Sequence, residues 1–229
     1  MPYKPNEREY RAMPIMIREA DPKQGAGTGM RVRGRFTTYE KPYLLYAFQD
    51  GSTRVEVWEQ VARDAFKEAD ETDVIMQYNH AGHVYARNAN NTLKLFDEDE
   101  GHAMEADLSG TTIGRQLYEE IAGGYTREMS MGFTIDAIEK AERWENINEP
   151  GEKLIILETI TKIRKLYDVS AVSIPANPGT SIMPLTRSAY LDGVVEDARK
   201  EIAAKREAER KRKLIALEIE MEVNTSEND

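Results

Sequence analysis

The sequence predicts an α+β fold that is mainly β, with an antiparallel sheet, closed or sandwiched, that is flanked by helices. Several short segments alternate apolar and polar residues, which is typical of a strand with one buried face. Two segments between them have apolar residues at the spacing of a short amphipathic helix. Strands and helices do not alternate regularly, as they do in a parallel βαβ fold, so an antiparallel architecture is favoured.

The first strands follow a polar lead-in that ends in a glycine-rich stretch at 25–29. Residues 30–38 alternate cleanly and predict a strand with one wet face. Residues 54–57 predict a shorter strand. Apolar residues at helical spacing then predict a short helix over 58–69.

The middle of the chain predicts strands around the first histidine. Residues 74–76 are typical of a buried strand that leads directly into His80. Residues 83–87 and 92–96 predict two strands joined by an asparagine-rich hairpin turn. Residues 102–107 predict another strand.

The second half predicts one more helix, followed by long strands. Helical spacing predicts a helix over 111–122, ended by two glycines. Residues 128–135 alternate, so that Ser130 stands on the face opposite to the large apolar side chains. Strands over 154–163 and 166–174 follow.

The C-terminal region has a different composition. From about residue 188 it is dominated by Ala, Glu, Lys, Arg and Leu, which predicts a charged helical extension over 188–229 with a disordered end. Basic residues gather at 205–213, but the glutamates among them favour a solvated helix face over a nucleic-acid surface.

Composition excludes several classes of function. The chain has 229 residues and a net charge of -10, so attraction to nucleic acid or to an anionic membrane is not expected. No apolar run approaches the roughly 20 residues that span a bilayer. The absence of cysteine excludes disulfides, thiolate zinc sites and a cysteine nucleophile, and it fits a reducing cytoplasm.

Three residues from separate segments are candidates for a hydrolytic triad: His80, Ser130 and Asp168. A serine hydroxyl becomes a good nucleophile when an imidazole takes its proton and a carboxylate fixes the tautomer of that imidazole. The chain order His, Ser, Asp differs from that of chymotrypsin, subtilisin and the α/β-hydrolases, and no Gly-x-Ser-x-Gly elbow surrounds Ser130. The residue types alone therefore leave an ordinary strand serine and a turn histidine as alternatives.

The histidines also raise the alternative of a metal site. His80 and His83 form a His-x-x-His pair, which suits a metal ion when it lies on a helix. The strand pattern around the pair disfavours a helix, so we expect neither a metal nor an organic cofactor. His102 lies in an acidic stretch that is typical of an exposed turn.

Motifs around the candidate residues add a family resemblance. A Val-x-x-x-Ala-Phe stretch at 61–66 precedes the Asn-His step at His80. A Met-Ser-x-Gly-Phe strand occupies 129–133, and a Leu-x-acidic-Val-Ser-x-Val-Ser-x-Pro-Ala-x-Pro segment occupies 166–178. Over about residues 30–186 the chain resembles the prohead (capsid maturation) proteases of tailed bacteriophages, which are serine proteases similar in fold to the herpesvirus assemblins.

The resemblance implies a role for each candidate. Ser130 would be the nucleophile, His80 the general base and Asp168 the acidic third member. Asp168 stands where the family often has glutamate. Since assemblins use a second histidine as the third member, His102 is the reserve candidate for that role, with His83 after it. The implied fold is a small antiparallel β-barrel flanked by helices, with the charged helical extension after it.

The implied function is that of a prohead maturation serine endopeptidase, which cleaves the scaffold protein or the scaffold-like arm of the major capsid protein, and also itself. We expect these two proteins as partners, self-association as a dimer, and a location in the host cytoplasm inside the immature capsid. The expected domains are a lead-in over 1–29, a protease domain over 30–187 and a tail over 188–229. The alternative is a non-catalytic scaffolding or assembly protein, which the charged C-terminal helix favours.

Overall fold

The computed structural model describes residues 8–13, 18–19, 29–147, 151–173 and 196–213. Within these ranges the fold is mainly β with two α-helices, which confirms the class that was predicted. None of the helices in these ranges is both long and apolar enough to cross a membrane.

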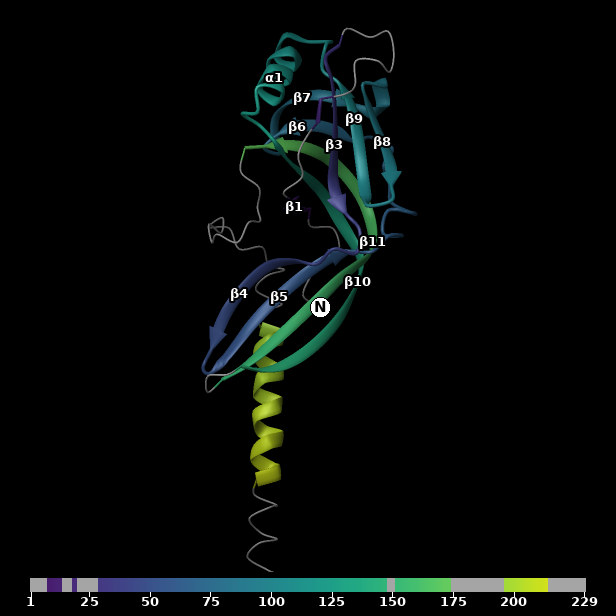
Figure 1. Ribbon diagram of the computed structural model, residues 1–229. Coiled ribbons are helices and arrows are strands. Elements are labelled where there is room, and N and C mark those ends of the chain that lie inside the picture. The colour runs from purple at the N-terminus through teal and green to yellow at the C-terminus, as the bar shows by residue number, and fades with distance from the viewer. Residues whose placement is uncertain (1–7, 14–17, 20–28, 148–150, 174–195, 214–229) are drawn as a thin grey trace, which may run out of the picture.

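Strands of the described residues form two sheets (Figure 1). The larger sheet has the order β1-β10-β11-β5-β4, and in addition β6 pairs with β11 and β7 with β6. Its strands are β1 (Glu9–Met13), β4 (Tyr43–Asp50), β5 (Thr53–Val61), β6 (Ile75–Tyr78), β7 (Ala81–Arg87), β10 (Glu128–Ile147) and β11 (Gly151–Val172). The smaller sheet has the order β2-β3-β9-β8. Its strands are β2 (Arg18–Glu19), β3 (Arg31–Thr38), β8 (Leu93–Glu98) and β9 (Gly101–Asp107).

The expectation of a small closed antiparallel barrel is wrong, because both sheets are open and the larger one is mixed. β5 and β6 pair in parallel with β11, whereas β10 pairs with it antiparallel. Side chains alternate in the same way in parallel and antiparallel strands, so the pattern of a strand does not reveal the direction of its neighbour.

The β10–β11 hairpin is the longest element and connects the two halves of the molecule (Figure 1). Its register runs from Glu128↔Val172 to Ile147↔Gly151, with several shifts between Gly132 and Ile138. β1 and β6 pair with its upper part in the figure and β5 with its lower part. The sequence predicts two strands where β11 is one, because charged residues at 164–165 interrupt the apolar run.

Two local predictions around the larger sheet are also wrong. The helix predicted over 58–69 does not form. Residues 58–61 continue strand β5, whose buried valines follow the strand period, and residues 63–68 form turns. The strands β7 and β8 do not form a hairpin, since β7 pairs with β6 and β8 with β9. The short helix η1 (Asn88–Asn90) connects them and carries the chain from one sheet to the other.

The predicted helix over 111–122 is confirmed as α1 (Thr112–Ala122), which ends before the two glycines as expected. Thr111 caps it by accepting a hydrogen bond from the Gly114 amide at 2.9 Å. Leu117 and Ile121 are its buried apolar side chains.

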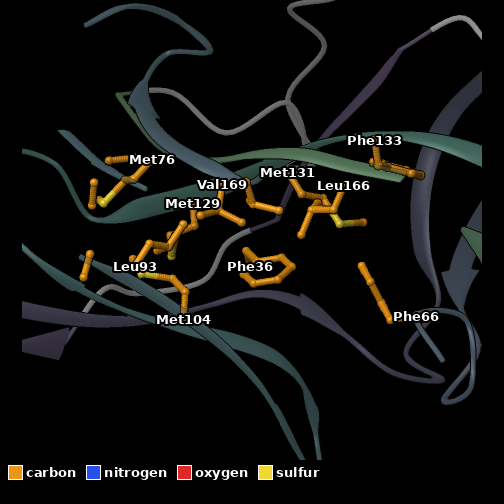
Figure 2. Packing of buried hydrophobic residues seen from close by; sticks show 14 of the residues in the cluster. Phe36, Phe66, Met76, Leu93, Met104, Met129, Met131, Phe133, Leu166 and Val169 are labelled. Carbon is orange, nitrogen blue, oxygen red and sulfur yellow. The ribbon is translucent and has the colours of Figure 1, made fainter. Parts of the chain in front are cut away.

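The main core lies between the two sheets and includes the buried face of α1. Figure 2 shows side chains of β3, β8 and β9 facing those of β6, β10 and β11; among those labelled are Phe36, Leu93, Met104, Met76, Met129, Met131 and Val169. A second cluster lies on the lower part of the larger sheet, where Ala198 and Ile202 of the helix over 196–213 pack against β4, β5 and β11. Residues 188–195 and 214–229 of the expected tail lie outside the described ranges.

Candidate active site

The hairpin β10–β11 places Ser130 and Asp168 close together on neighbouring strands. Ser130 is directly opposite Ser170, and Gly132 is directly opposite Asp168. Directly opposite residues of an antiparallel pair share one face of the sheet. Because Gly132 has no side chain, the position facing the Asp168 carboxylate is free of competing atoms on β10.

His80 is held in a tight turn between β6 and β7. The turn has two residues, Asn79 and His80, with φ values of 50° and 57°, and it is flanked by the pair Tyr78↔Ala81. Positive φ at both central residues is the geometry of a two-residue hairpin turn whose twist matches its strands. Asparagine and histidine tolerate positive φ better than most residues. The sequence Asn-His is therefore suited to present the imidazole from a rigid turn.

Asn79 fastens this turn to the end of β11. Its backbone amide donates to the Ala171 carbonyl at 2.9 Å, and its side-chain oxygen accepts from the Ser173 amide at 3.0 Å. The parallel pairing of β6 with β11 brings the turn to this position. His80 thus sits beside the same hairpin that carries the serine and the aspartate.

The structure brings the three candidate residues together. His80 Nε2 lies 2.6 Å from Ser130 Oγ, and His80 Nδ1 lies 2.6 Å from Asp168 Oδ1. An ionised carboxylate only accepts hydrogen bonds, so Nδ1 carries the proton and Nε2 of the neutral ring is free to accept one. These distances are within the reach that proton transfer requires.

The environment of these groups is largely closed to solvent. Asp168 is 0% exposed and Ser130 only 1%, whereas the His80 side chain retains 17%. Ser170, also fully buried, donates to the same Asp168 oxygen at 2.7 Å. The two-residue spacing of Ser170 from Asp168 places both on the same face of the strand, but nothing else in the sequence indicates a role for Ser170.

A second group reaches the Ser130 hydroxyl from strand β1. Ser130 Oγ is 2.9 Å from the carbonyl oxygen of Arg11, within hydrogen-bond distance. The hydroxyl has one proton, so Arg11 O and His80 Nε2 compete for it. β1, which pairs with β10 in the register Ala12↔Ser130, was not predicted from the sequence.

The other histidines lie apart from this arrangement. His83 is exposed on strand β7, so the helix that a His-x-x-His metal pair requires is absent at that point. The expectation that His102 lies in an exposed turn is wrong, because its side chain is buried. Its Nδ1 atom lies 2.8 Å from Asp97 and its Nε2 atom 3.0 Å from Glu71. Nowhere in the described ranges do three His, Cys, Asp or Glu residues form a cluster that could hold a metal ion.

We predict that His102 makes the stability of the fold depend on pH. Burial opposes the charge of its ring, but hydrogen bonds and attraction from Glu71 and Asp97 outweigh burial and raise the pKa of His102 above its ordinary value of 6.5. The stabilisation is therefore complete below pH 6.5 and is lost as the pH rises through the raised pKa. Urea unfolding at a series of pH values should show this loss in the wild type and not in His102→Gln. If the free energy of unfolding changed equally with pH in both proteins, His102 would not be the source of the pH dependence.

Comparison with known families decides what kind of protein carries this site. A family model for caudovirus prohead serine proteases matches residues 29–192. The chain belongs to this family. This match confirms the family that the motifs predicted. It is a family of bacteriophage serine proteases of capsid maturation. No curated protein and no solved structure matches the chain. His80, Ser130 and Asp168 fall inside the range matched to the prohead proteases, whereas β1 precedes it.

Proposed function

We propose that this chain is the serine endopeptidase that processes the prohead during phage head assembly, with Ser130, His80 and Asp168 as its catalytic residues. The observation that carries the proposal is the position of the His80 ring, with one nitrogen 2.6 Å from a serine hydroxyl and the other 2.6 Å from a buried carboxylate. Membership in the prohead serine protease family supports the same reaction.

The proposed reaction has two halves. In the first, Ser130 Oγ bonds to the substrate carbonyl carbon while its proton moves to His80 Nε2. The peptide C–N bond then breaks, and His80 gives the proton to the leaving amine. In the second half, water bonds to the acyl carbon and loses a proton to His80, which returns it to Ser130 Oγ as the acid leaves. Asp168 orients the ring and stabilises its charged form.

The substrates that we propose are the scaffold protein, or a scaffold-like arm of the major capsid protein, and the chain itself. These proteins would be its partners inside the immature capsid in the host cytoplasm, and the chain would act there as a dimer. The family description supports a role at the prohead stage.

Co-expression with the candidate capsid and scaffold proteins tests the proposal. We expect the wild type to shorten at least one of them, with new N-termini that mass spectrometry can map. Ser130→Ala should leave the same proteins at full length. Equal shortening by both forms would contradict the proposed nucleophile. Intact proteins with both forms, alongside heads that require the chain for assembly, would instead favour a non-catalytic scaffolding protein.

A further inference from the structure

Strand β1 lies on the strand of the proposed nucleophile in the manner of a bound substrate. It pairs antiparallel with β10 at one edge of the larger sheet, in the register Ala12↔Ser130. Extended peptides often bind proteins by adding a strand to a sheet edge, where main-chain bonds supply affinity and side-chain sites supply specificity. The carbonyl oxygen of Arg11 lies 2.9 Å from Ser130 Oγ. Arg11 therefore holds the place of the residue that would contribute the acyl carbonyl.

The Arg11 side chain is held in a buried acidic site. Its guanidinium makes a two-point ion pair with Glu59, Nε to Oε1 at 2.8 Å and Nη2 to Oε2 at 3.2 Å. Glu59 is 0% exposed and Arg11 8%. The Tyr43 hydroxyl donates to the same carboxylate. Burial opposes the charge of Arg11, but attraction from Glu59 and Glu9 outweighs it and raises the pKa of Arg11 above its ordinary value.

The acid that receives Arg11 belongs to the body of the sheet. Glu59 is on β5 and Tyr43 on β4, so both stay in place when β1 leaves β10. Glu9, which also contacts Arg11 at 3.0 Å, is part of β1 and leaves with it. An empty site therefore keeps the Glu59 carboxylate and loses the cation that covers it.

A buried carboxylate without a cation retains its desolvation cost and loses the compensating attraction. A peptide that brings a positive side chain to this position is consequently bound better than one that does not. The planar guanidinium fork matches a carboxylate at two points, whereas an ammonium group acts as a single point charge. The site thus favours arginine first and lysine second.

We propose that Glu59 is a specificity-determining residue and that the chain cleaves after arginine in extended peptide segments. β1 occupies the substrate position within the same molecule, with Arg11 at the bond presented to Ser130. The inference rests on the proposed function and deepens it by naming the class of substrate.

A competition between two peptides in one tube tests this inference with the full chain. One peptide carries residues 6–16 of this sequence, and the other has citrulline, the neutral isostere of arginine, in place of Arg11. Because both peptides meet the same molecules, the ratio of their kcat/KM values does not depend on how often β1 vacates the site. We expect a preference for the arginine peptide of about 10²-fold or more. Glu59→Gln should bring the ratio close to one.

Two further variants separate specificity from folding. Glu56→Gln is the matched control, because Glu56 is a buried acid on the same strand that pairs with Lys153 at 2.8 Å and Arg54 at 2.9 Å. It should keep the preference. If Glu59→Gln does not fold, the double variant with Arg11→Gln removes both members of the ion pair and allows the ratio to be measured.

The outcomes distinguish the inference from the proposed function. Equal cleavage of both peptides, cleavage of neither while the capsid protein is still processed, or an unchanged preference in Glu59→Gln would overturn the role of Glu59 and leave the peptidase intact. Loss of the proposed function itself would show as no cleavage of either peptide and no Ser130-dependent processing of capsid or scaffold protein.

Discussion

Ser130→Ala and His80→Ala are each expected to lower kcat for peptide cleavage by about 10⁶-fold. In the proposed reaction Ser130 supplies the oxygen that forms the new bond, and His80 Nε2, 2.6 Å away, takes the proton that otherwise leaves that oxygen a poor nucleophile. The two groups act as one unit, so the double variant should be no slower than either single variant. Single-turnover cleavage of a peptide taken from a mapped processing site measures all three rates.

His83→Ala is the matched control for the loss of an imidazole. His83 lies three residues after His80 but is exposed on β7. Its removal should leave the rate within about twofold of the wild type, since exposed substitutions away from the reacting groups have small effects. A loss at His83 as large as the loss at His80 would contradict the assignment of the base and would favour the metal-pair alternative.

The residues of the candidate site could be predicted because the sequence around each of them has a recognisable local pattern. The alternation of 128–135 put Ser130 on the face opposite to the methionines, and strand period put Asp168 and Ser170 on one face. The Asn79-His80 step follows the short apolar segment that begins strand β6. Each of these signals is local, and the flanking motifs, through their resemblance to the prohead proteases, assigned the three roles.

Strand β1, which covers the site, could not be predicted from the sequence in this way. Glu9 and Arg11 have the polar pattern of a solvated lead-in, and the buried Arg11 side chain pairs with Glu9 and with Glu59, which is 48 residues away. A charged side chain that is buried through an ion pair does not contribute to the apolar alternation by which a strand is recognised in a sequence. The same reason explains His102, whose acidic neighbourhood indicated exposure although Glu71 and Asp97 pair with the buried ring.

The arrangement of the sheets also depends on contacts between distant segments. β11 accepts β5 and β6 as parallel neighbours and β10 as an antiparallel one. Local alternation predicted most of these strands but carried no information about which edges would meet. An open mixed sheet and a closed antiparallel barrel therefore have the same local signature, and only the pairing separates them.

Asp168→Asn is expected to lower kcat by about 10⁴-fold while leaving the protein folded. The Asp168 Oδ1 atom accepts hydrogen bonds from His80 Nδ1 at 2.6 Å and from Ser170 Oγ at 2.7 Å. An amide oxygen in the same place can accept both bonds, so the ring keeps its position. The negative charge that would stabilise the imidazolium during proton transfer is lost, so kcat falls.

Stability should move differently from activity in this variant. Asp168 is 0% exposed, and its Oδ2 atom has no hydrogen-bond partner within the described residues. Removing the buried charge relieves a desolvation cost, and burying the new amide NH2 at the Oδ2 position opposes that gain, so the urea midpoint of Asp168→Asn should stay close to that of the wild type. Ser170→Ala, which keeps the charge and removes one hydrogen bond, should lower kcat by only about tenfold. A large drop in the urea midpoint of Asp168→Asn, or a rate loss in Ser170→Ala as great as in Asp168→Asn, would show that packing around the carboxyl group, and not its charge, supports the reaction.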